Sequence, residues 1–315
     1  MPESCPDVST EALALWCARW LGAPPAAELL RAGNLAAVRG LRLTDGREVV
    51  VKIRPWGPRL AGCAAVHRAL WAAGFACPEP LAGPHPLEGR AATAETLVPD
   101  IDEPPPASEL VAASAAALAR LVELAPDPAS VPSLAPSPSW NGWDHAGAAP
   151  WPVPEDRDVD LNAYAEPLWL DRVAAAVRDL LRRHGGTPVI GHGDWHPENM
   201  RWQGPQLVAV YDWDSVICQP EPAIAGLAAA SFLGIEDAAT MASADQSAAF
   251  LVAYLQARGC RWTAADYAAS WAAGLWQRAV DAKIWSLDGD PEQVLTRSEA
   301  RARLRRAGLS PGLAR

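Results

Sequence analysis

A short stretch of the chain, residues 191–214 (GHGDWHPENMRWQGPQLVAVYDWD), gathers most of the side chains that could carry out chemistry. Asp194 and Asn199 fall in a loop, and a β-rich run then leads to Asp212 and Asp214. A carboxylate can orient a hydroxyl group and accept its proton. Carboxylate and carboxamide oxygens suit Mg²⁺, which proteins commonly bind together with phosphates and water. The spacing therefore predicts phosphoryl transfer to a hydroxyl group.

Each polar residue of this stretch has a predicted role. We expect Asp194 to be the catalytic base, and Asn199 and Asp212 to bind the magnesium ion. Asp214 would bind a second ion or orient the ligands of the first. His192 is also a candidate catalytic residue. We favour a role in which it braces the loop by hydrogen bonds over direct participation in the chemistry.

A lysine near the N-terminal end is the second candidate feature. Lys52 follows the apolar run Val49–Val51, and Lys283 is the only other lysine among 27 basic residues. An ammonium group is a compact point charge that can contact phosphate where a planar guanidinium would not fit. We therefore predict that Lys52 binds phosphate; a strand-end lysine that extends into solvent is the alternative.

Composition and charge exclude several classes of protein. A chain of 315 residues suits one large domain or two lobes. The net charge of −10 argues against a nucleic-acid partner. No apolar run reaches the roughly 18 residues of a membrane helix, and no signal peptide is evident. Six scattered cysteines without a CxxC pair suit reduced thiols. We expect a cytoplasmic protein without nucleic-acid or membrane partners, while its oligomeric state is not indicated.

The first 98 residues have the pattern of a small α+β lobe. Asp45-Gly46 separates two β-like runs and is a strong hairpin signal, because both turn positions favour positive φ. The elements expected in this lobe are a helix over 11–21, strands over 38–44 and 47–53, a helix over 58–73, and strands near 79–81 and 91–98.

The remaining residues have the pattern of a larger helical lobe. The acidic, proline-rich segment 99–107 is predicted to be a hinge. The lobe over 108–315 contains an irregular insertion, residues 125–165, which we expect to bind substrate. The other elements expected there are helices over 108–124 and 168–184, strands over 189–190 and 207–211, and mostly helix from residue 223 onward.

The motif H-G-D-x-x-x-x-N over 192–199, followed by a hydrophobic strand and D-W-D over 212–214, closely resembles the aminoglycoside phosphotransferase family. That family is related to the protein kinases. The resemblance covers most of the chain, including VVVKI and the acidic hinge. It implies a two-lobed, protein-kinase-like α+β fold with a β-rich N-terminal lobe and a mostly helical C-terminal lobe. It also implies ATP and Mg²⁺ as cofactors and a small hydroxylated acceptor, such as an aminoglycoside or a sugar or amino-alcohol metabolite.

The same resemblance implies further site residues. Lys52 would contact the α- and β-phosphates of ATP, Thr96 and Val98 would meet the adenine, and the turn at Gly33 and Asn34 would cover the phosphates. Asp156 and Asp158 would receive ammonium groups of a cationic acceptor. We also expect Trp195 and Glu221 to bind the acceptor. For the acidic loop residues, the alternative is a solvated surface.

Four tryptophans flank the insertion, at positions 140, 143, 151 and 169. They would either stack on a large substrate or fill the core, and we favour the core because aromatic side chains mostly do so.

One departure from the family pattern concerns the partner of the lysine. The family usually has a glutamate on the helix after the lysine strand, but no acidic residue occurs here from 54 to 78, and the expected position falls near Cys63. Lys52 would then be held by phosphate and Asp212 alone, or by a residue from elsewhere. A catalytically weak nucleotide- or metabolite-binding protein is therefore one alternative function.

A metal-dependent hydrolase is the second alternative. His192, Asp194 and His196 form the pattern H-x-D-x-H, and together with Asp212 and Asp214 they could hold a transition metal. Asn199 has a clear role only in the phosphoryl-transfer scheme.

Overall fold

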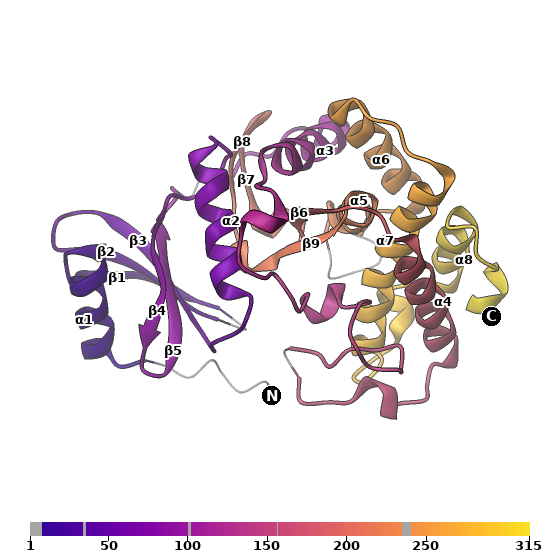
Figure 1. The fold of residues 1–315 in the computed structure, drawn as a ribbon, viewed down its shortest axis with the longest axis horizontal. Helices are drawn as coiled ribbons and strands as arrows, with labels where there is room; N and C mark the ends of the chain where they lie inside the picture. Colours follow the sequence, from indigo (N-terminus) through magenta and orange to yellow (C-terminus); the bar gives the residue numbers. More distant parts are fainter. Residues whose placement is uncertain (1–7, 34–35, 100–101, 156, 235–240) are drawn as a thin grey trace.

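Two separate hydrophobic cores lie in the part of the chain that the computed structural model describes, residues 8–33, 36–99, 102–155, 157–234 and 241–315. The smaller core joins a β-sheet to one helix, and the larger core lies among the remaining helices. Figure 1 shows the corresponding β-rich and helical lobes side by side. The predicted two-lobed, protein-kinase-like α+β fold is confirmed. Two predicted site residues, Asn34 and Asp156, lie outside the described residues.

The N-terminal lobe is an antiparallel sheet with helix α1 (Thr10–Leu21) on one face. The strand order is β1-β2-β3-β5-β4. The strands are β1 (Pro25–Ala32), β2 (Ala37–Leu43), β3 (Glu48–Arg54), β4 (Pro80–Leu87) and β5 (Arg90–Thr96). The hairpin between β2 and β3 is confirmed, since Gly46 has φ 88° and its N–H donates to the carbonyl of Leu43 at 3.0 Å.

Alternation along β3 decides which side chains face the site. Val49, Val51 and Ile53 are buried in the core beneath α1. Lys52 and Arg54 point to the opposite face because successive side chains of a strand alternate. The lysine therefore faces the larger lobe. Strand β1 was not predicted; nearly all of it is exposed, so it lacks the two-residue apolar alternation that marks a half-buried strand.

Helix α2 (Leu60–Ala72) connects the lobes and packs into the larger core. Figure 1 shows it between the sheet and the C-terminal helices. The ring of His67 stacks on Trp213 with centroids 5.0 Å apart, and Arg59 donates to the carbonyl of Val216. Helix α2 is thus anchored to the loop that carries Asp212 and Asp214.

The C-terminal lobe consists of helices around two short antiparallel strand pairs. Within the predicted hinge, the backbone N–H of Glu103 donates to the carbonyl of Trp202 at 2.8 Å. The helices are α3 (Ala107–Leu124), α4 (Leu168–His184), α5 (Glu221–Ser231), α6 (Ala244–Arg258), α7 (Ala264–Trp285) and α8 (Arg297–Arg306). The strand pairs are β6 (Pro188–His192) with β9 (Val216–Pro220), and β7 (Met200–Gln203) with β8 (Gln206–Val210).

Close packing of α5 against α7 builds the centre of this lobe. A Cβ added at Gly226 would lie 1.9 Å from the carbonyl oxygen of Ser270, so only glycine allows the two backbones to approach this closely. Helix α7 begins with a capping box at Thr263 and Asp266 and is buried along most of its length.

The described part of segment 125–165 contains three short 3₁₀-helices and neither α-helix nor β-strand. Its aromatic residues fill the core: Trp143, Trp151 and the nearby Trp169 are all buried. Trp140 is partly buried against the same core. The core interpretation of the tryptophans is therefore confirmed for three of the four.

Candidate active site

The catalytic-loop motif begins where β6 ends, at His192. Its ring is fully buried, its Nε2–H donates to the carbonyl of Tyr211 at 2.9 Å, and its Nδ1 accepts from the N–H of Asp194 at 3.2 Å. Burial lowers the pKa of His192, so the ring stays neutral. With both nitrogens engaged, His192 ties the loop to the residue before Asp212. It fits the bracing role rather than a direct catalytic one.

The glycine of the motif is required by close packing. The N–H of Gly193 donates to the carbonyl of Ser215 at 2.8 Å, and its own carbonyl accepts from Nδ2 of Asn141 at 2.9 Å. A Cβ at this position would lie 2.2 Å from that nitrogen. The loop is therefore fixed against both the turn that follows Asp212 and the irregular segment.

Asp194 and Asn199 are in direct contact within this loop. Nδ2 of Asn199 lies 3.0 Å from both the carbonyl oxygen and Oδ2 of Asp194. Oδ2 also lies 3.1 Å from Nε2 of His196. Because Nδ2 of Asn199 is used by the loop, the side-chain oxygen Oδ1 is the atom of Asn199 that could bind a cation. Burial alone would lower the pKa of His196, but the hydrogen bond and charge of Asp194 outweigh burial and raise it.

Asp212 has the properties of a cation ligand. Its backbone is left-handed (φ 60°), and Oγ of Ser215 donates to its Oδ2 at 2.7 Å. Burial alone would raise the pKa of Asp212, but the charges of Lys52 and Arg54 and the hydrogen bond from Ser215 outweigh burial and lower it. The carboxylate therefore stays ionised.

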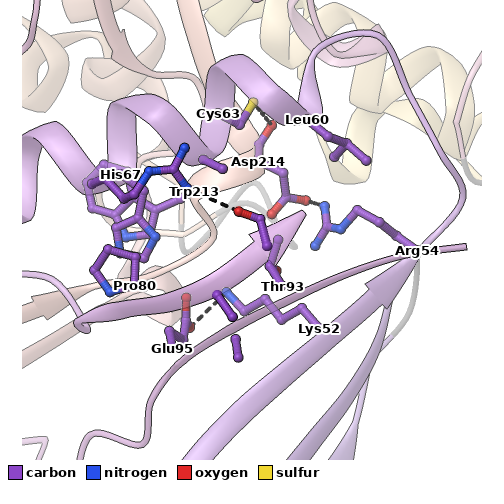
Figure 2. A pocket seen from close by; sticks show the side chains of 15 residues that line it. Lys52, Arg54, Leu60, Cys63, His67, Pro80, Thr93, Glu95, Trp213 and Asp214 are labelled. Carbon is purple, nitrogen blue, oxygen red and sulfur yellow. Dashed lines mark hydrogen bonds and ion pairs between the residues drawn. The ribbon is translucent and has the colours of Figure 1, made fainter. Parts of the chain in front are cut away.

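Asp214 is instead paired with a side chain of the other lobe. It forms an ion pair with Arg54 of β3, and its carbonyl oxygen lies 3.8 Å from Sγ of Cys63 on α2 (Figure 2). This arrangement holds the D-W-D loop against the N-terminal lobe. The prediction of a second metal ligand fits Asp214 less well than an interlobe contact does, because the carboxylate already has a cationic partner.

Lys52 has a carboxylate partner that the sequence did not reveal. Its Nζ lies 3.1 Å from Oε1 of Glu95 on β5, and the two side chains are 12% and 9% exposed (Figure 2). A residue from elsewhere thus takes the partner position that helix α2 leaves without a carboxylate. The sequence signal that could have indicated this partner is Glu95 itself, the single acidic residue in the otherwise uncharged run after Arg90. Its pairing with Lys52, however, depends on how β5 pairs with β3.

The predicted groups from the two loops and β3 converge. The charges of both Asp194 and Asp212 act on His192, and the charges of Lys52 and Arg54 act on Asp212. The structure therefore brings Asp194, Asp212 and Lys52, the predicted base, cation ligand and phosphate-binding group, to the same interlobe region.

Two predicted acceptor residues lie elsewhere. Trp195 is 1% exposed and its Nε1–H donates to Oγ of Ser114 at 3.0 Å, so it packs in the core behind the loop. Glu221 accepts from Tyr254 and Arg258, both at 2.8 Å, at the start of α5. Substrate contact by Trp195 or Glu221 does not fit these positions, because both side chains have structural partners. Asp158 is exposed on the irregular segment.

The predicted nucleotide residues lie at the ends of strands. Oγ1 of Thr96 accepts from the N–H of Glu79 at 2.9 Å, at the end of β5, and Val98 lies two residues further, directly before the predicted hinge. Gly33 follows β1 with φ 120°, and a Cβ there would lie 1.8 Å from the carbonyl oxygen of Ala36. Their contacts with nucleotide remain predictions.

Comparison with known proteins decides the family. The sequence profile of the phosphotransferase enzyme family matches residues 26–270. The chain belongs to this family. The resemblance to aminoglycoside phosphotransferases is thereby confirmed, and family and fold together indicate a small-molecule phosphotransferase. A comparison with curated protein sequences gave no match.

Solved structures of the phosphotransferase family share the fold. A putative aminoglycoside phosphotransferase from Ralstonia eutropha is 15% identical with a TM-score of 0.59, covering 98% of each chain. A putative fructosamine-3-kinase from Thermobifida fusca is 18% identical with a TM-score of 0.54, covering 93% of this chain and 98% of the other. A spectinomycin phosphotransferase bound to ADP and spectinomycin is 12% identical with a TM-score of 0.57, covering 96% and 97%.

The geometry of this phosphotransferase argues against a transition-metal hydrolase. Both ring nitrogens of His192 are engaged, so the H-x-D-x-H pattern lacks one of its ligands. Among the residues that the structure describes, no group of three or more His, Cys, Asp or Glu side chains is arranged to hold a metal ion.

In the described part of the chain, no helix combines the length and apolarity needed to cross a membrane.

Sequence reasoning also missed Asp281, on helix α7 of this phosphotransferase. Its carboxyl group lies 3.3 Å from Nε2 of Gln277, and the charges of Asp194 and His196 act on it. Burial raises the pKa of Asp281 to about 7. Its side chain nevertheless remains partly exposed, which places it at the edge of the catalytic region rather than in the sealed core.

We predict that Asp281 makes the protein less stable as the pH rises. The folded state keeps this proton up to about pH 7, whereas an unfolded carboxyl releases it near pH 4. Between these values the folded state binds more protons, so the free energy of unfolding decreases with increasing pH. Asp281→Asn should therefore be about 1–3 kcal/mol more stable than wild type at pH 8, after allowance for solvent screening.

Urea unfolding at pH 8 and pH 5 measures this effect. The stability gain of Asp281→Asn should shrink at pH 5, and Asp179→Asn on the exposed face of α4 is the matched control. A variant less stable than wild type at pH 8 would show that the ionised Asp281 carboxylate is favourable in the fold.

Proposed function

We propose that this phosphotransferase transfers the γ-phosphoryl group of ATP to a hydroxyl group of a small molecule. The observation that carries the proposal is the convergence of Asp194, Asp212 and Lys52 from two loops and a strand. Support comes from the related spectinomycin phosphotransferase bound to ADP and from a related amicoumacin kinase bound to AMP-PNP and Ca²⁺.

The side chains suggest how the reaction proceeds. Asp194 orients the acceptor hydroxyl group, and Oδ of Asp194 takes its proton as the new oxygen–phosphorus bond forms. The bond from the γ-phosphorus to the bridging oxygen of ADP breaks at the same centre. Lys52 binds the remaining phosphates as a point charge.

Magnesium fits the oxygen donors of the site. The carboxylate of Asp212 and the side-chain oxygen Oδ1 of Asn199 would hold the ion, since Mg²⁺ commonly uses one or two protein oxygens together with phosphates and water. The ion supplies positive charge that stabilises the charge on the phosphates. The lowered pKa of Asp212 supports this assignment because the ligand must be ionised.

The proposed acceptor is a small molecule that carries a free hydroxyl group. An antibiotic such as an aminoglycoside and a sugar or amino-alcohol metabolite both provide the hydroxyl group that Asp194 requires. A cationic acceptor is further supported by the net charge of −10 and by the carboxylate of Asp194.

A screen of hydroxylated small molecules with Mg·ATP tests the proposal. We expect at least one acceptor to gain the mass of one phosphoryl group with release of ADP, measured by mass spectrometry. The product should disappear without Mg²⁺. Nucleotide binding without a phosphorylated product from any acceptor would favour the alternative of a nucleotide-binding protein without turnover.

A further inference from the structure

We propose that Glu95 is the positioning residue for Lys52, so that the lysine–carboxylate pair of this enzyme is built within one β-sheet and does not depend on helix α2. This inference rests on the proposed function, because the task of Lys52 is to bind the phosphates of ATP. It assigns to a strand residue the role that the family usually gives to a helix glutamate.

The register of β3 and β5 places the two side chains together. The strands are antiparallel, with Lys52 opposite Thr93 and Val50 opposite Glu95. Lys52 and Glu95 are therefore diagonal neighbours on one face, a spacing that long side chains can bridge. Their ion pair of 3.1 Å is set by the backbone ladder itself.

Burial makes this ion pair consequential. With side chains only 12% and 9% exposed, neither charge is well solvated, so removal of one leaves the other uncompensated. His67 lines the same cavity, but burial lowers its pKa to about 4 and its Nε2 lies 2.8 Å from the carbonyl oxygen of Pro78. A neutral histidine does not compete with Lys52 for the carboxylate.

Helix α2 presents no acidic group to the lysine. A cavity of about 50 Å³ lies between this helix and the sheet (Figure 2). Cys63, Ala64 and His67 line it from α2. The helix is instead anchored to the D-W-D loop through Cys63 and Trp213. A shift of α2 would therefore leave the lysine–carboxylate pair intact.

The location of Glu95 also directs Lys52. Lys52 pairs with Glu95, and its charge also acts on Asp212, the proposed cation ligand of the loop. Holding the ammonium group there before ATP binds reduces the conformational freedom that binding must otherwise remove.

The test compares Glu95→Gln with wild type in steady-state kinetics. Loss of the charge should raise the KM for ATP and lower kcat/KM for ATP by about 10- to 100-fold, since charge-assisted interactions are strong and Lys52 is no longer held. The matched control is Glu48→Gln on the same strand β3, which removes the exposed pair of Glu48 with Arg42 (2.8 Å) and leaves the pair of Lys52 with Glu95 in place. This control should keep wild-type kinetics.

A double-mutant cycle distinguishes positioning from a general structural role. In a Lys52→Met background, Glu95→Gln should change kcat/KM by less than about twofold, because the group that it positions is absent. A further loss of about tenfold in that background would show that Glu95 acts independently of Lys52 and would overturn the inference.

Moving the carboxylate provides a second test. Ala64→Glu places an acidic side chain on the wall of the same cavity and has little helix cost. In the Glu95→Gln background it should recover part of the lost affinity for ATP, measured as KM. If Glu95→Gln fails to fold, Glu95→Asp, which retains the charge but is one methylene shorter, should show the same rise in KM to a smaller degree.

The outcomes separate the inference from the proposed function. A wild-type enzyme that phosphorylates no acceptor contradicts the proposed function. An active wild-type enzyme whose kinetics are equally unaffected by Glu95→Gln and Glu48→Gln contradicts only the role of Glu95.

Discussion

Replacing Asp194 with asparagine should lower kcat by about 10²- to 10⁴-fold while Mg·ATP binding stays within about twofold of wild type. A carboxamide keeps the size of the side chain and an oxygen for the hydrogen bond from Asn199, but it cannot take the proton of the acceptor hydroxyl group. The loop should therefore keep its shape, since His192 braces it from the other side.

The measurement combines single-turnover kinetics with nucleotide titration. Glu198→Gln is the matched control because Glu198 is an exposed carboxylate of the same loop, and it should retain activity. If Asp194→Asn turns over at a near wild-type rate, Asp194 is not the base. If it loses Mg·ATP binding together with turnover, its main role lies in the nucleotide site.

Asp212→Asn should impair nucleotide binding and turnover together. The variant removes the charge that makes this oxygen a magnesium ligand, so half-saturation by Mg²⁺ should require at least about tenfold more metal, and kcat/KM should fall by about 10²-fold or more. The fold should survive because asparagine also tolerates the left-handed backbone at φ 60° and can still accept from Ser215.

Asp214→Asn is the informative comparison for this experiment. Its carboxylate is paired with Arg54 across the lobes, so the variant should lower the free energy of unfolding by about 1–3 kcal/mol with a smaller change in Mg²⁺ dependence. Mg²⁺ titration and urea unfolding of both variants measure these effects. Unchanged Mg²⁺ dependence in Asp212→Asn, with a large shift in Asp214→Asn, would reverse the two assignments.

Local patterns account for the elements that were predicted well. The Asp45-Gly46 turn and the apolar face of α4 each depend on residues within a few positions of one another, and both elements occur where the sequence places them. The loop of Asp194 and Asn199 is also local, because the two residues that contact each other are only five positions apart in the chain.

Long-range pairing accounts for what was missed. Trp195 and Glu221 have residue types that suit a binding site, but Ser114, Tyr254 and Arg258 engage them from distant helices. Nothing near them in sequence indicates those partners. The burial of a side chain is therefore better evidence about substrate binding than its residue type and its position next to a motif.

The sequence by itself determined the two-lobed fold, the family and the order of the groups that carry the chemistry, because motif spacing is a property of the chain. Only the tertiary structure decided which charges meet. The pairs of Lys52 with Glu95 and of Arg54 with Asp214 join segments 43 and 160 residues apart. The physical reason is that strand register and the docking of the lobes set the distances between these side chains. Neither can be predicted from any short segment of the chain.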